Sequence, residues 1–188
     1  MRTAKEVICE AFLELLSERS FQDLSVKEIV QRAQISRSTF YLHFTDKFEL
    51  IEHVRKTLND LFLSFYKQDS LLKDTPSTPY FLCRHILKYR SFYVIEFDNA
   101  DEIRKLSDQL AAHLLSAFGD QDYAIFASYG TIGYLSFWVR NDFVISPGEA
   151  AEKLLKIGFT DWTHHLKMKL DLVKTNDQSS NLAKPPSR

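Results

Sequence analysis

The sequence predicts an all-α protein, and three observations support that prediction. Only 5 Gly and 5 Pro occur among 188 residues, and long stretches contain neither. Apolar residues recur at the three- and four-residue spacing of amphipathic helices. Several segments open with a hydroxyl residue that is followed three positions later by Glu, which is the pattern of a helix capping box. Length and composition are those of a soluble globular chain of one or two domains.

The first predicted helix spans residues 4–17. Thr3 and Glu6 form a capping box at its start, and an apolar stripe runs from Val7 to Leu16. Four glutamates occupy the outer face, namely Glu6, Glu10, Glu14 and Glu18. We expect a supporting helix, connected to the next segment through Phe21 and Leu24.

Residues 25–44 contain two short helices joined by a tight turn. Ser25 and Glu28 form a second capping box, and apolar residues at positions 26, 29, 30 and 33 share one face. Gln34 and Ile35 form the turn, and Ser36 caps a helix that runs to about Phe44. This arrangement is a helix-turn-helix.

The second of these helices has exposed polar side chains, which are not needed for the core. Phe40 and Phe44 share its inner face and pack with Ile35. A helix of barely two turns that exposes Arg37 and its neighbours is typical of a recognition helix in a DNA groove. The exposed set is Arg37, Ser38, Tyr41, Leu42 and His43.

The segment from Ser36 to Leu50, SRSTFYLHFTDKFEL, resembles the core motif of the tetracycline-repressor (TetR) family of bacterial regulators. The resemblance extends upstream and covers about the first third of the chain. Two residues depart from the family pattern. Gln34 stands where the family usually has Gly, and a non-Gly residue in the left-handed conformation costs on the order of 1 kcal/mol. Ser38 stands where Gly or Pro is common.

The resemblance implies an N-terminal three-helix helix-turn-helix DNA-binding domain at residues 1–47. A C-terminal helical ligand-binding and dimerisation domain is expected at residues 48–170. A helix from about residue 46 to 68, capped by Thr45, would link the two. Residues 171–188 are polar and end in Pro-rich sequence, so they are expected to form a flexible tail.

Eight residues are expected to contact double-stranded DNA. Arg37 and Ser38 open the recognition helix and are the expected base readers, with Arg37 suited to the O6/N7 edge of guanine. By its place in the family motif, Lys27 is expected to reach the groove, and Leu42 could touch a thymine methyl. The expected phosphate contacts are Thr39, Tyr41, His43 and Lys47.

Charge supports a local rather than a global attraction to DNA. The net charge of the chain is −1, whereas residues 25–47 carry four Lys and Arg against Glu28 and Asp46. We therefore expect a site-specific binder with modest nonspecific affinity, and a repressor as the family implies. The alternative is a helix-turn-helix co-regulator that acts mainly through a protein partner.

The C-terminal part divides into several further helices. Residues 69–79 form a linker, and residues 80–97 are helical in pattern but change polarity near Arg90 and Ser91, so two helices are possible. Residues 100–118 form a cleaner helix that Gly119 should end. Ser146, Pro147 and Glu149 then mark a clear helix start.

Residues 123–139 are apolar on all sides. A membrane span is one interpretation, but the run is shorter than the 20 or so residues that a span needs. A helix buried in its own domain and against a partner is the favoured interpretation. No membrane contact is expected.

The resemblance implies a homodimer formed through the last two long helices, residues 123–141 and 147–162. Exposure of the first of these to water would leave a large apolar patch, and Gly130 and Gly133 would allow a close approach of the partner. The two-fold axis implies a roughly palindromic operator. The expected interface comprises Tyr123, Gly130, Gly133, Tyr134, Phe137, Trp138, Leu154, Leu155, Gly158 and Trp162.

A pocket for a small hydrophobic inducer is a further family property. Aromatic residues are abundant in the C-terminal part, but aromatic side chains fill cores as readily as they line pockets. The two interpretations are equally supported. The candidate pocket residues are Tyr89, Tyr93, Phe97, Phe126 and Tyr129.

An enzyme is not expected. The six His are scattered without metal-ligand spacing, no Gly-rich phosphate loop occurs, and no cofactor or metal is predicted. Cys9 and Cys83 are lone thiols, which fits a reducing cytoplasm. The N-terminus lacks the apolar core of a signal peptide.

Overall fold

The computed structural model describes residues 2–68 and 77–158. Nine helices and no strand occur among these residues, which confirms the all-α prediction. The described residues up to 154 form one compact unit, and the predicted tail lies outside the described residues. The helices are α1 (Ala4–Leu16), α2 (Val26–Arg32), α3 (Arg37–Tyr41), α4 (Lys47–Gln68), α5 (Thr78–Lys88), α6 (Arg90–Glu96), α7 (Ala100–Phe118), α8 (Gln121–Arg140) and α9 (Pro147–Gly158).

The three predicted capping boxes are confirmed. In each, the hydroxyl oxygen accepts the N–H of a Glu three residues on, and the Glu carboxylate accepts the N–H of the hydroxyl residue. Both exchanges satisfy donors that a helix start otherwise leaves unpaired. The boxes are Thr3–Glu6, Ser25–Glu28 and Ser146–Glu149.

Other boundaries differ in detail from the predictions. The recognition helix ends at Tyr41 rather than Phe44. The predicted cap of α4 at Thr45 is wrong by one residue, because Asp46 Oδ1 accepts the N–H groups of Phe48 and Glu49, both at 2.8 Å. Gly119 ends α7 in the left-handed conformation with φ 71°, as predicted.

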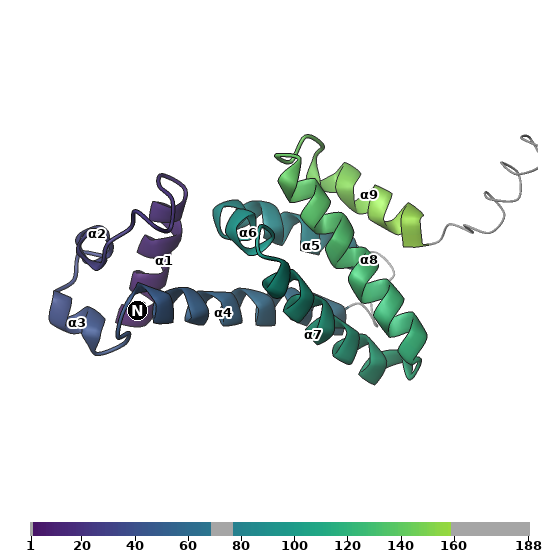
Figure 1. Ribbon diagram of the computed structural model, residues 1–188, viewed down its shortest axis with the longest axis horizontal. Coiled ribbons are helices and arrows are strands. Elements are labelled where there is room, and N and C mark those ends of the chain that lie inside the picture. The colour runs from purple at the N-terminus through teal and green to yellow at the C-terminus, as the bar shows by residue number, and fades with distance from the viewer. Residues whose placement is uncertain (1, 69–76, 159–188) are drawn as a thin grey trace, which may run out of the picture. The chain divides into compact units, whose positions relative to one another are not determined.

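Helices α1–α3 form the head, and they gather at the N-terminal end of α4 (Figure 1). Their shared core contains the fully buried side chains of Ile8, Phe12, Ile29 and Phe40. Burial of a side chain of this size contributes roughly 1.5–3 kcal/mol. The inner face of α4 continues this core, first through Leu50 and later through Phe62, so one helix serves both the head and the following helices.

A buried ionic cluster fixes α4 to α6 and α7. Arg55 Nε on α4 donates to both carboxylate oxygens of Glu96, at 3.0 and 2.9 Å, and lies 3.3 Å from Glu102. Glu52 also contacts Arg55. Burial raises the pKa of Glu96, while Arg55 works against that increase. The cluster therefore holds a carboxylate in the interior and fixes the orientation of α4.

Helices α7 and α8 run side by side (Figure 1). One face of α8 is buried through residues such as Ala124, Ser128, Ile132 and Leu135. The opposite face exposes aromatic rings and two glycines, so within this chain α8 is covered on one side. Among the described helices, none combines the length and the apolarity that crossing a bilayer requires.

Candidate nucleic-acid interface

Helix α3 presents a compact set of exposed side chains on a buried anchor. Phe40 is fully buried, and its ring packs against Phe44 with centroids 5.8 Å apart. On the other side Arg37, Tyr41 and Leu42 are exposed, and Leu42 is 81% accessible. The anchor fixes the helix, so these side chains keep a defined direction.

The remaining predicted contact residues lie on or beside α3. Ser38 and His43 are exposed and Thr39 is half-buried, while Lys27 is exposed on α2. Ser36 Oγ accepts the Thr39 N–H at 3.0 Å and lies 2.7 Å from Ser38 Oγ. The cap of α3 therefore also orients the hydroxyl of one expected base reader.

The turn between α2 and α3 adopts the strained conformation expected from the sequence. Gln34 has φ 53°, which is the left-handed region that Gly adopts without penalty. The Ile35 N–H donates to the Val30 carbonyl at 3.1 Å and closes the end of α2. This is the bond pattern of a Schellman motif. The backbone path is that of a glycine turn, although Gln occupies it.

Lys47 does not lie free at the expected phosphate position. Its Nζ donates to the backbone carbonyls of Phe21 at 2.9 Å, Gln22 at 2.8 Å and Leu24 at 2.8 Å. An ammonium group has three N–H donors, so all are engaged. The ammonium also lies 4.9 Å from the centroid of the Phe21 ring. The prediction that Lys47 holds a phosphate conflicts with this geometry. The sequence could not reveal it because backbone carbonyls have no residue pattern.

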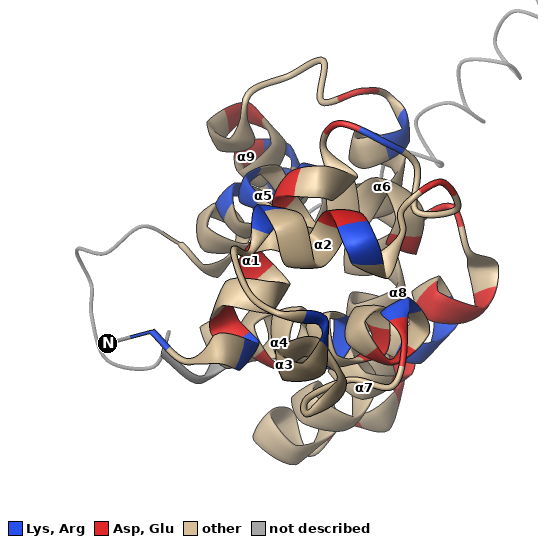
Figure 2. Ribbon diagram, turned by 90° about the vertical axis from the view of Figure 1, so that its left-hand side faces the viewer, with Lys and Arg blue, Asp and Glu red and all other residues tan. Residues whose placement is uncertain are grey.

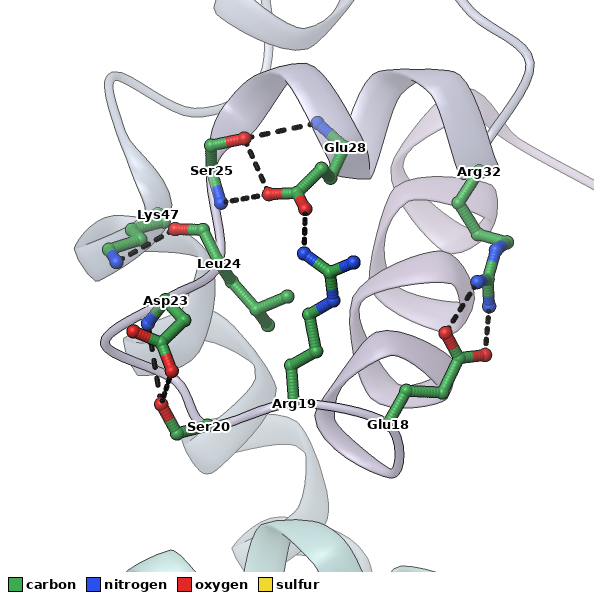
Figure 3. Close-up of polar contacts among 9 residues, drawn as sticks. All are labelled: Glu18, Arg19, Ser20, Asp23, Leu24, Ser25, Glu28, Arg32 and Lys47. Atoms are coloured by element: carbon green, nitrogen blue, oxygen red, sulfur yellow. Dashed lines mark hydrogen bonds and ion pairs between the residues drawn. The ribbon is translucent and has the colours of Figure 1, made fainter.

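Two arginines of the head are likewise engaged within the chain (Figure 3). Arg32 donates to both carboxylate oxygens of Glu18, at 2.9 and 2.8 Å, and Arg19 donates to Glu28 at 2.6 Å. The Arg32 hydrogen bond lowers the pKa of Glu18. Hydrogen bonds from Ser25 lower the pKa of Glu28. Of the four cations in residues 25–47, Arg32 is therefore paired with a carboxylate within the chain.

Figure 2 looks onto the side of the molecule that carries α2 and α3, where basic and acidic segments interleave. Seven Lys and Arg occur from residue 2 to residue 47. Arg2, Arg19 and Arg32 pair with carboxylates and Lys47 with carbonyls. Within the described residues this leaves three cations of the head without a carboxylate or carbonyl partner, namely Lys5, Lys27 and Arg37.

A family model described as "Bacterial regulatory proteins, tetR family" matches residues 8–54, which are α1–α3 and the start of α4. The head of the chain is therefore of the TetR family. The match covers the head and its junction with α4, as the motif at residues 36–50 predicted.

The chain is also similar to known proteins over most of its length. The chain is 25% identical over 169 residues to an uncharacterised HTH-type transcriptional regulator, YxbF, from Bacillus subtilis. That match covers 82% of this chain but 44% of the relative, so the chain spans less than half of that protein's length.

Two crystal structures share the fold of this chain. A TerR/AcrR-family transcriptional regulator from Aquifex aeolicus has a TM-score of 0.62 at 24% identity, and the match covers 84% of this chain and 100% of that one. A putative TetR-family regulator from Syntrophomonas wolfei has a TM-score of 0.64 at 16% identity, with coverages of 82% and 92%.

The residues predicted for a dimer interface separate into exposed and buried groups. Tyr123 and Phe137 are exposed on α8, and Tyr134 is half-buried. A methyl group added to Gly130 or Gly133 would meet no other atom within 4 Å. Both glycines therefore lie on an open surface of this chain.

Two of the predicted interface residues belong to the core instead. Trp138 is 2% exposed, and its indole N–H donates to the Ile145 carbonyl at 3.0 Å. Leu154 is also buried. Their place in the helical pattern did not distinguish the inner face of α8 or α9 from the outer one. Leu155 is half-buried, Gly158 is exposed, and Trp162 lies outside the described residues.

The five candidate pocket residues do not come together. Tyr93 and Phe97 are fully buried and Tyr89 is half-buried, but Phe126 is 68% exposed and Tyr129 is exposed. Phe126 follows the buried Ala124 by two positions, which turns its side chain about 200° around the helix. The prediction that Phe126 and Tyr129 line an enclosed pocket is wrong.

Two open clefts occur elsewhere among the described residues. The larger, about 1020 Å³, lies between the segment after α1, helix α6 and the end of α8, with Phe21, Val94 and Arg140 in its lining. The smaller, about 590 Å³, lies between α1 and the junction of α5 with α6. Segments some 70 residues apart in the sequence form them, so no local pattern predicts them. In the described residues, no group of three His, Cys, Asp or Glu is placed to hold a metal ion.

Proposed function

We propose that this chain is a TetR-family transcriptional repressor that binds a palindromic DNA operator as a homodimer. The observation that carries the proposal is the surface of α3. Its inner residue Phe40 is fully buried, while Arg37, Ser38 and Tyr41 are exposed together on the other side. A recognition helix needs this combination of a rigid support and free polar side chains.

The sequence of the operator would be read chiefly by Arg37, which can pair in a bidentate manner with guanine. Tyr41, His43 and Thr39 are placed beside it for backbone contacts, and Leu42 for a thymine methyl. Three cations per head have no carboxylate or carbonyl partner within the described residues. With Arg37 assigned to a base, Lys5 and Lys27 of the two heads would give a plot of log affinity against log salt with a slope of about −4 if all four contact phosphates.

The exposed face of α8 supports the homodimer. Phe126 and Phe137 are 68% and 62% exposed, and between them lie Gly130 and Gly133 with open space above them. An apolar aromatic surface of this kind on a water-soluble chain marks an interaction site. A second copy of α8 that packs across the two glycines would cover it. The two-fold axis would then place two recognition helices on half-sites about one helical turn or more apart.

The experiment that tests the DNA proposal is a gel-shift and footprint assay with the DNA upstream of the chain's own gene. We expect a protected, roughly palindromic site, whose occupancy is lost in an Arg37→Ala variant. If no specific site is protected, while the chain captures another helix-turn-helix protein, the co-regulator hypothesis gains support and the operator proposal fails.

Release by a small apolar inducer is the part of the proposal that rests on family resemblance. Tyr93 and Phe97 fill the core, and the Tyr93 hydroxyl lies 2.8 Å from His85 Nε2. An inducer bound here would have to displace these rings. Screening of apolar compounds for an increase in melting temperature and for release of the operator tests this point. Compounds that change neither quantity would remove the inducer and leave the DNA proposal intact.

A further inference from the structure

Three backbone carbonyls converge on the Lys47 ammonium at the junction of the head with α4. They belong to Phe21, Gln22 and Leu24, and the three distances lie between 2.8 and 2.9 Å. The residues that contribute them lie 23 to 26 positions earlier in the sequence. Charged hydrogen bonds are stronger than neutral ones, so this contact is a firm tie between distant segments.

The tie joins the segment before α2 to the segment after α3. Leu24 directly precedes Ser25, the cap of α2, and Lys47 is the first residue of α4. The helix-turn-helix lies between these two points. A fixed distance between its two ends restricts the angle at which α3 projects from the head.

Neighbouring contacts make the carbonyl segment rigid (Figure 3). Ser20 Oγ donates to Asp23 at 2.7 Å, and Arg19 links the segment to Glu28 on α2. Beneath it the Phe21 ring packs edge-on against Phe12 and Phe48, at centroid distances of 6.1 and 5.5 Å. These contacts order the three carbonyl groups independently of Lys47, so the Lys47 ammonium binds a preformed site.

We propose that Lys47 is a positioning residue for DNA binding, which sets the orientation of the recognition helix through its three carbonyl contacts rather than by contacting a phosphate. The inference rests on the proposed operator binding. The salt dependence of operator affinity distinguishes the two roles of Lys47. Loss of a phosphate contact lowers the salt slope by about one, whereas loss of a positioning contact lowers affinity at an unchanged slope.

The test measures operator affinity over a range of salt concentrations for the wild type and for Lys47→Met, which keeps the aliphatic stem. The measurement is made at low temperature, and circular dichroism verifies that the variant is folded. We expect an affinity loss of about tenfold or more at every salt concentration, with the slope of the wild type. Lys27→Met serves as the matched cation on α2, and its slope should fall by about one if it contacts a phosphate. Lys56→Met, on the exposed side of α4, should change neither quantity.

Each alternative outcome overturns a different statement. A slope reduced by about one in Lys47→Met would assign Lys47 to a phosphate. An unchanged affinity would show that the contact of Lys47 with the three carbonyls does not contribute to DNA binding. Either result would refute the positioning proposal and leave the proposed function intact. Absence of specific binding by the wild type would instead remove the proposed function, and the inference with it.

A second measurement needs no substitution and covers the case in which Lys47→Met does not fold. In the wild-type chain with isotope-labelled lysine, the Lys47 ammonium protons should exchange slowly, both free and bound to operator. No coupling to phosphorus should appear on binding. Rapid exchange in the complex, or coupling to a phosphate, would refute the proposal.

Discussion

The exposed surfaces of α3 and α8 differ in chemistry and in what supports them. Helix α3 exposes the polar residues Arg37, Ser38 and Tyr41, whereas the open stripe of α8 exposes Phe126 and Phe137 around two glycines. The first surface has hydrogen-bonding groups for base edges and phosphates. The second is apolar at these positions and would gain free energy chiefly from exclusion of water.

The supports behind the two surfaces also differ. Besides the buried Phe40, ionic contacts and hydrogen bonds to backbone carbonyls brace the helix-turn-helix, such as those of Arg32 with Glu18 and of Lys47 with three carbonyls. A buried cluster of aromatic rings around His85 lies in the core to which α8 belongs. The comparison indicates that reading DNA requires side chains held in a fixed direction, whereas association with another chain requires an exposed apolar area. Each difference can be tested.

The largest effect is expected from a charge on the apolar surface. Gly133→Arg would place a cation in the centre of the proposed contact, while the open space above Gly133 lets the single chain fold. We expect dissociation into monomers and a loss of operator affinity of at least about a hundredfold, because a burial of unpaired charge disfavours the dimer strongly. Sedimentation and gel-shift titration measure both quantities.

The matched control is Ser116→Arg on the exposed side of α7, which should remain dimeric and bind the operator normally. If Gly133→Arg sediments like the wild type, α8 is not the dimer surface. The glycines would then need another explanation.

Acid should destabilise the buried aromatic cluster around His85 more than the ionic contacts of the head. Burial, aided by the nearby Lys88, lowers the pKa of His85 to about 4 from 6.5, although a hydrogen bond with the Leu58 backbone opposes this. The unfolded chain binds the proton more readily, so the free energy of unfolding falls as pH falls from about 6.5 to about 4. The loss amounts to about 3 kcal/mol at the lower end. Glu96, whose pKa burial raises, contributes in the opposite direction.

Denaturant unfolding at several pH values isolates this contribution by comparing the wild type with His85→Gln. Gln can keep a hydrogen bond to the Tyr93 hydroxyl but does not titrate. The pH dependence of the variant should therefore be shallower between about pH 4 and 6.5. Parallel curves for the two proteins would show that His85 is not the titrating group.

The same two surfaces show what the sequence can and cannot predict. Most helix starts, the turn at Gln34 and the family motif depend on neighbouring residues, so local patterns are enough to predict them. The solvent-facing side of α8 is not predictable from the sequence, because a run that is apolar on all sides does not indicate which face of the helix is buried. Trp138 and Phe126 were therefore assigned to the wrong faces. The contacts of Lys47 are not predictable for another reason, since its partners are carbonyls more than 20 positions away.

A smaller effect is expected from the recognition surface itself. Arg37→Ala should weaken operator binding by about 1–3 kcal/mol and relax preference at one base position, because a bidentate contact to guanine is lost. Titration against a set of operators with single base changes measures both effects. Arg84→Ala, which removes an exposed cation on α5, is the control and should alter neither. A uniform loss over all operator variants would show that Arg37 holds the backbone rather than a base.

The smallest effect concerns the turn that connects the two halves of the helix-turn-helix. Gln34 has φ 53°, and replacement by Gly removes a steric penalty on the order of 1 kcal/mol, while Gly adds entropy to the unfolded chain. The net result should be an increase in unfolding free energy of a few tenths to about 1 kcal/mol. Operator affinity should stay unchanged, because Gln34 lies outside the recognition helix. Gln31→Gly, in the regular part of α2, is the matched control and should lower stability by about 1 kcal/mol. If Gln34→Gly is instead destabilising, the Gln34 side chain makes a contribution that outweighs its backbone strain.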